Sequence, residues 1–326
     1  MKAVLCKELG MPEKLVIEDI PSPRPAKGQV VVSVKACGVN FPDTLMIQGK
    51  YQFKPELPFS PGGEVAGVIK ELGEGVAGVK PGDRVIAFNT WGGFAEEMVV
   101  DADRTIAIPA SMDFIPASAL VLTYGTSYHA LKDRADLKAG ETLLVLGASG
   151  GVGLATIQLG KAMGARVIAA ASSDEKLKVC RDHGADETIN YTSEDLRARV
   201  KAITAGNGVD VVYDPVGGPY SELALRDMAW KGRFLVVGFA AGEIPKVPLN
   251  LTLLKGCSIV GVFWGAFTKK EPERNRENNR QLMNLYAQGR IKPHIHATYP
   301  LERATEALNE VLNKRVSGKV VLVTGR

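Results

Sequence analysis

The stretch LLVLGASGGVGLATIQLGKAMGARVIAAASSDEKL, residues 143–177, decides the fold of this chain. It runs from an apolar segment through a cluster of glycines into a helix-like stretch, and then into a second apolar segment. Glycines between a strand and a helix let backbone amides approach a phosphate, because glycine has no Cβ to block them. Three glycines, Gly150, Gly151 and Gly153, stand at this point, and Ala148 replaces the first glycine of the usual G-x-G-x-x-G pattern. The pattern predicts a dinucleotide site, and the alternative is a tight turn without a ligand.

The end of the second apolar run favours NADP(H) over NAD(H). NAD sites usually carry an acidic residue about 20 residues after the glycines, where it binds the ribose hydroxyls. Here the run ends in Ser172 and Ser173, and Lys176 follows one helical turn later. Two hydroxyls and an ammonium would bind a 2′-phosphate, which a carboxylate would repel. In the alternative interpretation the serines only cap the next helix, and the nearby Asp174 and Glu175 would weaken the preference.

From residue 142 onward, strand-like and helix-like segments alternate. Strands are expected at TLLVLGA, RVIAAA, ETINY, VDVVYDPVG, RFLVVG and SIVGVFW, and helices lie between them, including YSELALRDMAW at 220–230. Such alternation predicts parallel strands joined by crossover helices, which is the doubly wound or Rossmann sheet of an α/β protein.

The first third of the chain has a different pattern. Short valine-rich runs such as VVVSVKACGV, EVAGVIKELG, DRVIAF and AEEMVV are separated by Gly, Pro and Asp. This spacing predicts a rolled antiparallel sheet or partial barrel. The last residues contain two helix-like stretches and a closing strand, KVVLVTG. We therefore expect a β-rich domain formed by 1–122 and 266–326, and a dinucleotide-binding domain formed by 123–265.

Composition indicates an ordinary globular protein. The chain has 326 residues, 45% of them hydrophobic, and a formal net charge of +4. This mild charge, with no basic-aromatic stripe, argues against nucleic acid as a partner. No apolar run approaches the length of a membrane span or signal peptide. Four widely separated cysteines suggest reduced thiols in a cytoplasmic protein.

Order and spacing of motifs along the whole chain resemble the medium-chain dehydrogenase/reductase superfamily, and within it the zinc-independent quinone oxidoreductase (zeta-crystallin-like) branch. The motifs are ACGVNFPDTLMIQGKY, PGGEVAGVI, PGDRVIAF, ALVLTYGTSYHAL, LGASGGVGLATIQLGKAMGA, INY, VYDPVGG and SGKVVL. The resemblance implies a GroES-like fold for the β-rich domain. It also implies NADP(H) as the cofactor.

The zinc ligands of the superfamily's alcohol dehydrogenases are missing from this chain. Those enzymes carry a ligand in a G-x-C-x-x-D stretch and another in G-H-E, where this chain has Asn40 and Gly63. Neither residue offers zinc a thiolate or an imidazole. The four-cysteine lobe of the structural zinc is also absent, Cys37 lies three residues too early, and the four histidines lack partners in ligand spacing. We therefore expect no zinc.

The resemblance assigns site residues position by position. It places Asn40, Tyr51 and Thr126 beside the nicotinamide as the expected catalytic residues, although Asn40 also suits a turn cap and Tyr51 a surface loop. Some relatives have a second tyrosine where this chain has Leu45. The expected cofactor-binding residues are Asn40, Thr126, Ser149, Gly150, Gly151, Val152, Gly153, Ser172, Ser173, Lys176, Tyr191, Gly217, Gly238, Phe239, Ala240, Phe263, Trp264 and Lys319. Tyr191 would stack near the adenine, and Phe263 and Trp264 would wall the nicotinamide pocket, with an aromatic core as the alternative for all three. Lys319 would reach the cofactor from the tail.

The function expected from these residues is hydride transfer from NADPH to an acceptor that is already electrophilic, a quinone or conjugated enone. A reductase of 2-enoyl thioesters such as enoyl-CoA is the main alternative, and a non-catalytic NADPH-binding sensor or crystallin is a further one. Lys269, Lys270 and the run RNRENNR at 274–280 supply positive charge for a CoA substrate, but Glu and Asn are mixed into it. The family also implies a homodimer formed through the last strand of the coenzyme domain, SIVGVFW, because an exposed apolar edge is otherwise a liability.

Overall fold

The computed structural model describes residues 1–325 and divides the chain into two compact units. The first unit contains Met1–Leu122 and the chain from Pro293 onward, and the second contains Thr123–Lys292. Each unit has its own sheet and its own hydrophobic core.

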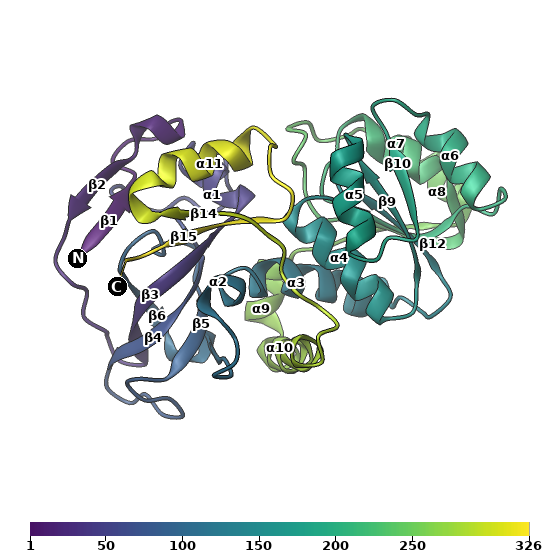
Figure 1. The fold of residues 1–326 in the computed structure, drawn as a ribbon. Coiled ribbons are helices and arrows are strands. Elements are labelled where there is room, and N and C mark those ends of the chain that lie inside the picture. The colour runs from purple at the N-terminus through teal and green to yellow at the C-terminus, as the bar shows by residue number, and fades with distance from the viewer. Residues whose placement is uncertain (326) are drawn as a thin grey trace. The chain divides into compact units, whose positions relative to one another are not determined.

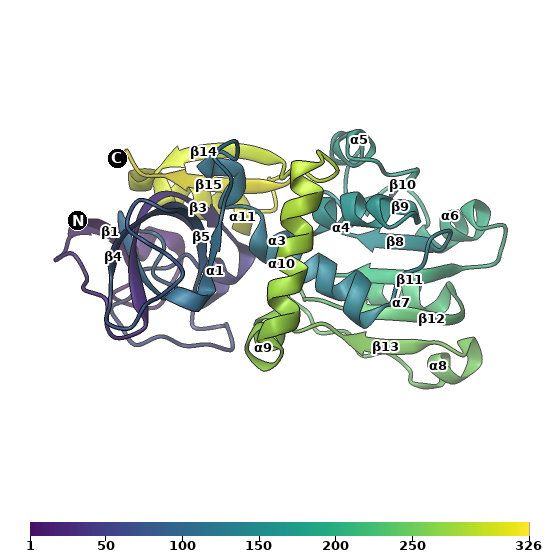
Figure 2. The ribbon, with the colours of Figure 1, turned by 90° about the horizontal axis from the view of Figure 1, so that it is seen from below.

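The second unit is a six-stranded parallel sheet in the order β10-β9-β8-β11-β12-β13, which can be followed from top to bottom in Figure 2. Its strands are β8 (Thr142–Leu146), β9 (Arg166–Ala171), β10 (Glu187–Asn190), β11 (Val209–Asp214), β12 (Met228–Val236) and β13 (Ser258–Gly261). Its helices are α3 (Val121–Tyr128, which begins in the first unit), η3 (His129–Arg134), α4 (Gly151–Ala162), α5 (Asp174–Asp182), α6 (Leu196–Ile203), α7 (Pro219–Arg226), α8 (Asn250–Lys255), α9 (Trp264–Lys270) and α10 (Pro272–Ala287). Consecutive apolar residues such as Leu143–Leu146 are fully buried, because helices cover both faces of a parallel sheet. The predicted doubly wound fold is confirmed.

The first unit is built around a seven-stranded sheet in which β14-β15-β3-β4-β5-β7 are neighbours and β6 also pairs with β3. The strands are β3 (Gln29–Val39), β4 (Glu64–Leu72), β5 (Arg84–Phe88), β6 (Glu97–Asp101), β7 (Thr105–Ala107), β14 (Ile295–Pro300) and β15 (Lys319–Val323). A separate antiparallel pair consists of β1 (Lys2–Leu5) and β2 (Val16–Asp19). The helical segments are η1 (Pro12–Lys14), α1 (Phe41–Met46), η2 (Ala102–Arg104), α2 (Phe114–Ala117), η4 (Leu301–Arg303) and α11 (Ala304–Leu312).

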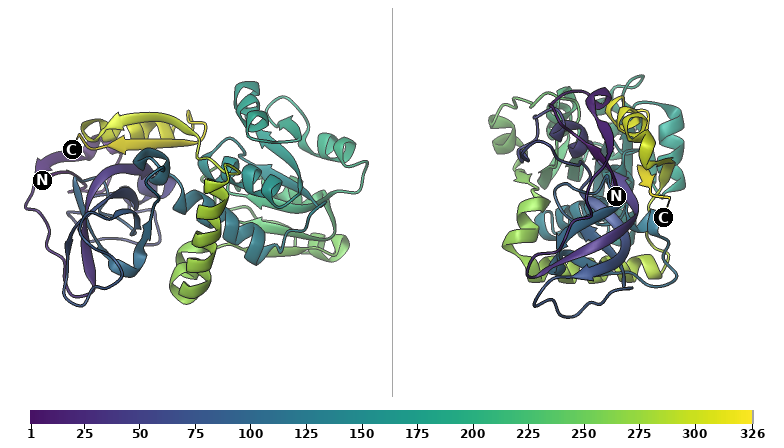
Figure 3. Two further views of the ribbon diagram at one scale, coloured as in Figure 1. Left: turned by 60° about the horizontal axis from the view of Figure 1, so that its bottom comes forward. Right: turned by 90° about the vertical axis from the view of Figure 1, so that its left-hand side faces the viewer.

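Strands from the first third of the chain and from residues 295–323 contribute to this sheet. Strand β15 pairs antiparallel with β3, and Val320 faces Val39 in the register. Figures 1 and 3 show the yellow C-terminal segment lying along the purple and blue strands of the N-terminal third. The β-rich, mostly antiparallel architecture expected from the sequence is therefore present.

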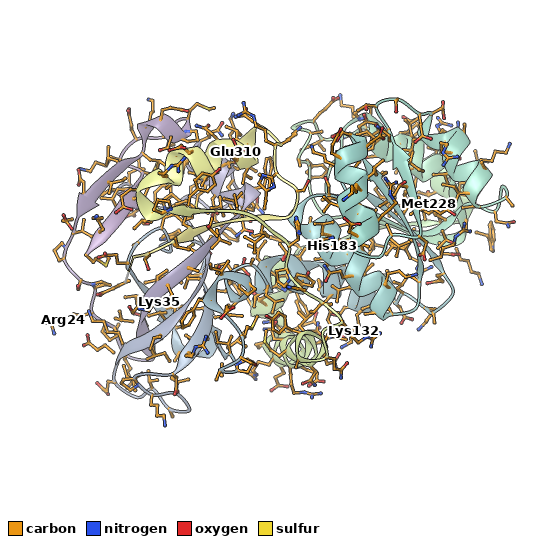
Figure 4. The ribbon with its side chains drawn as sticks, in the orientation of Figure 1. Arg24, Lys35, Lys132, His183, Met228 and Glu310 are labelled. Carbon is orange, nitrogen blue, oxygen red and sulfur yellow. The ribbon has the colours of Figure 1, made fainter. Side chains whose placement is uncertain are left out.

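The return to the first unit occurs at Pro293, whereas the sequence places it at residue 266. The intervening helix α10 belongs to the second unit, because its polar face is bonded to the end of α3 and to η3. Lys132, labelled in Figure 4 beside α10, donates to Asn278 Oδ1 at 2.9 Å and to Gln281 Oε1 at 2.8 Å. Asn278 in turn donates to Asp133 at 2.8 Å.

A second difference concerns residues 227–230, which the sequence assigns to a helix. Helix α7 ends at Arg226, and Met228 already pairs with Val209 as the first residue of β12. Asp227 closes the helix by donating its amide to Ala224 O at 3.1 Å. Strand β13 likewise ends at Gly261, so that Phe263 and Trp264 begin α9 instead of continuing the strand.

Helix α8 and the loop before it expose large aliphatic side chains, here called the α8 patch: Ile244, Leu249, Leu253 and Leu254. Leu253 is 80% exposed. Among residues 1–325, no helix is both long enough and apolar enough to cross a membrane.

Candidate functional site

The glycine-rich loop forms the N-terminal end of α4 directly after β8. Gly150 is the N-cap, and the first intrahelical bond runs from the amide of Leu154 to Gly150 O at 2.9 Å. The amides of Gly151, Val152 and Gly153 therefore precede that bond, which is the arrangement that suits a bound anion. A Cβ at Gly153 would lie 2.5 Å from the carbonyl oxygen of Ala148, so only glycine allows the helix to approach the strand this closely. Ser149 is buried in the same loop.

The residues predicted to bind a 2′-phosphate meet at the end of β9. Lys176 Nζ donates to Ser172 Oγ at 3.2 Å. Ser173 is the N-cap of α5, where its hydroxyl accepts from the Lys176 amide at 3.3 Å. Ser173 is therefore a helix cap, as in the alternative interpretation. Ser172 and Lys176 form a polar pair at the carboxyl end of β9. Asp174 is held by Asn190, whose Nδ2 donates to its carboxylate at 2.9 Å.

Tyr191 lies immediately after β10, half-buried against the core of the second unit. Its ring is tilted against that of Tyr220, with 4.3 Å between the ring centroids. Burial raises the pKa of Tyr191, and a hydrogen bond with Ser172 partly offsets this. Tyr191 therefore packs as a core residue and also borders the Ser172–Lys176 group.

Asp214 organises the loops at the carboxyl ends of β11 and β12. This buried carboxylate accepts from the amides of Val216 and Gly217 at 2.8 and 2.9 Å and from the Ser221 hydroxyl at 2.5 Å. Gly217 has a φ of +71°, and a Cβ there would lie 2.9 Å from the Phe239 ring. The structure thus brings Gly217 and Phe239 together, and sequence reasoning missed the aspartate that holds the loop.

The chain from Gly238 to Ala240 lies beside the loop that follows β11. The Gly238 amide donates to Asp214 O at 3.3 Å, and the Ala240 amide donates to Pro215 O at 3.0 Å. Both residues therefore stand at the carboxyl end of the sheet, where ligands bind in such folds.

Thr126 sits half-buried on α3 beside a chain of buried hydroxyls. Ser127 is within 3.0 Å of Tyr213 OH and accepts from Thr156 at 3.0 Å. These hydroxyls connect α3 to β11 and α4, and so fix the helix that carries Thr126. Burial raises the pKa of Tyr213 to about 12.

The two aromatic residues after β13 have different surroundings. Trp264 is 6% exposed, and its ring lies 3.0 Å from the position of a Cβ on Gly125, so it packs as core against α3. Phe263 is 49% exposed. Of the two, only Phe263 has substantial surface for a ligand.

In the first unit, Asn40 and Lys319 meet in a buried cluster. Lys319 Nζ donates to Val39 O at 2.9 Å and to Asn40 Oδ1, and the Asn40 amide nitrogen donates to Gly38 O at 3.0 Å. Both side chains are 5% exposed. Lys319 therefore points into the first unit's interior instead of extending from the tail.

Two carboxylates complete this cluster, which we call the Lys319 cluster: Asn40, Asp43, Glu64 and Lys319. Glu64 Oε2 lies 3.8 Å from Lys319 Nζ and accepts no hydrogen bond within residues 1–325, while Oε1 accepts from the Leu122 amide at 2.9 Å. Asp43 accepts from the backbone amide of Asn40 at 2.8 Å.

The shifted pKa values of the Lys319 cluster have a common cause. Burial raises the pKa of Asp43 to about 7 and raises the pKa of Glu64. Burial also lowers the pKa of Lys319, and the two nearby carboxylates partly offset this because they raise it.

Tyr51 lies half-buried near the Lys319 cluster and packs against the hydrophobic core of the first unit. Burial raises the pKa of its phenol, and the nearby Asp43 raises it further. Its ring is tilted relative to that of Phe53, with 5.9 Å between the two ring centroids. Tyr51 is thus a neutral phenol that keeps its proton.

The donor set of the Lys319 cluster does not match a zinc site. Gly63 has no side chain, and a Cβ there would lie 2.6 Å from the backbone oxygen of Asn89. The Asn40 oxygen already accepts from the Lys319 ammonium. Within residues 1–325, no group of three His, Cys, Asp or Glu side chains is arranged to hold a metal ion.

The comparisons with known proteins cover nearly the whole chain. Residues 151–285 match the family model described as zinc-binding dehydrogenase, and residues 26–110 match the alcohol dehydrogenase GroES-like domain. A quinone oxidoreductase-like protein 2 homolog from Nematostella vectensis is 42% identical, with 99% of this chain and 89% of the relative covered. Human quinone oxidoreductase is 36% identical over 99% of this chain and 98% of its own length. The structure of Escherichia coli quinone oxidoreductase complexed with NADPH has a TM-score of 0.92 and 30% identity, covering 99% of this chain and all of the other.

The fold and the glycine loop define a two-unit dehydrogenase/reductase, with a GroES-like domain and a Rossmann-like domain. Within that class, the chain belongs to the quinone oxidoreductase family of the medium-chain dehydrogenase/reductase superfamily. The family resemblance seen in the sequence is confirmed.

Proposed function

We propose that this protein is an NADPH-dependent oxidoreductase that transfers hydride to a quinone or a conjugated enone. One observation carries the proposal: the glycine-capped start of α4 follows β8, and the Ser172–Lys176 group follows the neighbouring strand β9 of the same parallel sheet. Relatives named quinone oxidoreductase, and a neighbouring structure complexed with NADPH, support it.

The residues of the second unit fit a dinucleotide. The amides of Gly151, Val152 and Gly153 would hold the pyrophosphate at the end of α4. Lys176 and Ser172 would bind the 2′-phosphate through an ammonium and a hydroxyl, with Tyr191 bordering the adenine. The remaining second-unit residues proposed to contact the cofactor are Thr126, Ser149, Gly217, Gly238, Phe239, Ala240 and Phe263. NADPH supplies a hydride when it is bound.

The first unit supplies the residues proposed to act at the nicotinamide and the acceptor. Asn40, whose side-chain amide is held by Lys319, would orient the nicotinamide. Tyr51 would keep its proton at neutral pH and donate a hydrogen bond to the acceptor oxygen, because its pKa is raised. A Tyr51→Phe variant is expected to have a lower kcat with NADPH binding retained.

We further propose that the activity needs no zinc. A quinone or enone is already electrophilic, whereas alcohol oxidation in the zinc-containing relatives uses the metal to ionise a hydroxyl. The amide at Asn40 and the missing side chain at Gly63 support this proposal.

We also propose a homodimer formed at the edge of the second unit's sheet. Strand β13 has a neighbour on one side only, and the α8 patch exposes four large aliphatic side chains in the same unit. An unpaired strand edge and an apolar surface both favour association with a second copy. The cytoplasmic location expected from the four cysteines stays a prediction.

The proposed function is tested by NADPH oxidation with purified, chelator-treated protein. An ortho-quinone, a small enone and a 2-enoyl-CoA are compared as acceptors, each with NADPH and NADH. Turnover of the quinone or enone with NADPH, unaffected by chelator, is the expected result. A strong preference for the thioester would instead identify an enoyl-CoA reductase, and NADPH binding without turnover would favour a sensor or crystallin role.

A further inference from the structure

We propose that the Lys319 ammonium, a cation buried in the first unit, fixes the orientation of the Asn40 side-chain amide. Lys319 is then a positioning residue, which acts through Asn40.

The position of the ammonium carries the first step. Three oxygens surround Nζ: Val39 O at 2.9 Å, Asn40 Oδ1, and Glu64 Oε2 at 3.8 Å. Asn40 and the residue before Glu64 are the two positions at which zinc-containing members of the superfamily carry ligands. The ammonium of Lys319 therefore lies against the first of these positions, Asn40, and against Glu64, which follows the second.

The balance of charge carries the second step. Glu64 is fully buried, and in the described part of the chain its Oε2 accepts no hydrogen bond. A buried carboxylate without a nearby cation is strongly unfavourable. Lys319 is the cation that lies within 4 Å of this oxygen. Its positive charge therefore offsets the buried negative charge of Glu64.

Hydrogen-bond chemistry carries the third step. An ammonium can only donate, and the Gly38 carbonyl can only accept. The Asn40 amide lies between them, so its oxygen must face Lys319 and its nitrogen must face Gly38. A half-turn of the amide would set donor against donor and acceptor against acceptor. The cation and the Gly38 carbonyl thus select the same orientation of Asn40, and the cation fixes its oxygen.

The experiment compares two variants that differ only in the ammonium, Glu64→Gln and the double variant Lys319→Met with Glu64→Gln. The double variant removes both charges together, so it avoids the uncompensated carboxylate that would threaten folding in Lys319→Met alone. A matched control is Lys70→Met with Glu97→Gln, because this pair is also in the first sheet, with a 2.7 Å contact and a buried Oε2 without a partner.

Two readouts follow. Solvent exchange of the Asn40 side-chain amide hydrogens, measured by NMR on asparagine-labelled protein, is expected to be slow in the parent protein and in Glu64→Gln and at least about tenfold faster in the double variant. The kcat for NADPH oxidation is expected to fall at least about tenfold in the double variant, with the Kd for NADPH within about twofold. The control pair is expected to leave kcat unchanged.

The kcat readout rests on the proposed function, and the exchange readout does not. If the parent protein reduces no acceptor, the proposed function fails while the exchange rates still test the role of Lys319. Equal exchange rates in Glu64→Gln and in the double variant would overturn the positioning role. An equal loss of kcat in the control pair would also overturn it, because the effect would then be one of general stability.

Discussion

At the scale of single residues, Lys176 carries the proposed choice between the two nicotinamide dinucleotides. Its ammonium is held next to the end of β9 by Ser172, with 3.2 Å between Nζ and Oγ. A Lys176→Ala variant is expected to raise the KM for NADPH at least about tenfold, because a charge-assisted contact to phosphate is lost. The KM for NADH is expected to change little. Steady-state kinetics with both cofactors measure the difference.

The neighbouring Lys178 provides the control for this prediction. It lies on the same helix, is 75% exposed and pairs with Asp182 at 3.6 Å. Lys178→Ala is expected to leave both KM values unchanged. Equal effects of Lys176→Ala on NADPH and NADH would contradict the phosphate assignment.

The raised pKa of Asp43 predicts that the stability of the folded protein decreases as the pH rises. Its pKa rises from 3.8 to about 7 in the folded protein, so the folded state keeps a proton that the unfolded state releases. The contribution of Asp43 is therefore present below pH 4 and is lost as the pH rises towards 7, at no more than about 1.4 kcal/mol per pH unit.

An Asp43→Asn variant should lack this loss of stability. Urea unfolding of the parent and the variant at several values between pH 4.5 and 8 measures it, and the difference between the two free energies of unfolding is expected to grow as the pH rises. A constant difference across this range would show that Asp43 is ionised in the folded protein.

Residues of the site differed in how far sequence could predict them. Ser172 and Lys176 follow a recognisable strand at a known distance from the glycines, so local sequence sufficed. The meeting of Lys319 with Asn40 joins residues 279 positions apart, and no local pattern encodes it. A signal for Glu64 did exist, since a carboxylate beginning a buried apolar strand needs a partner.

At the scale of elements, α4 shows how closely a helix is fitted to its strand. A Gly153→Ala variant would place Cβ 2.5 to 2.6 Å from backbone atoms of Gly147 and Ala148, and backbone atoms cannot move aside easily. We expect a lower melting temperature and loss of NADPH binding, measured by thermal unfolding and fluorescence titration.

Gly160→Ala on the same helix is the graded control. Its Cβ would meet side-chain atoms, Leu143 Cδ2 at 2.8 Å and Val167 Cγ2 at 3.1 Å, and these can shift. This variant is expected to lose some stability and to keep NADPH binding. Retained binding in Gly153→Ala would mean that the loop has another role.

Elements with strong periodicity were predictable, and those defined by tertiary contacts were not. The alternation from β8 to β13 follows from apolar runs separated by helical stretches. Helix α8 was missed because it is short and buries only Leu251, while Leu253 and Leu254 face outward, so no buried stripe marks it. The place of α10 was missed because the polar contacts that hold it come from Lys132 and Asp133, far away in the sequence.

At the scale of the whole molecule, the α8 patch predicts the oligomeric state. A double variant Leu253→Asp with Leu254→Asp is expected to convert a dimer to a monomer, because it places two charges on side chains that are 80% and 70% exposed. Light scattering coupled to size-exclusion chromatography measures the mass.

Met11→Asp is the control for the dimer, since Met11 is an apolar residue of the first unit that is 48% exposed. This variant is expected to keep the mass of the parent protein. A parent protein with the mass of a single chain would contradict the proposed dimer.

The pairing of β3 with β15 also determines the order in which the two units can fold during synthesis. The first sheet needs residues 320–323 beside residues 36–39, so it cannot close until residues 320–323 have left the ribosome. The second unit, Thr123–Lys292, is contiguous and has all its strands available earlier. Domains fold as units during synthesis, and pairings between distant residues form slowly. The Rossmann-like unit is therefore the part that folds first, and Lys319 is among the last residues to take its place.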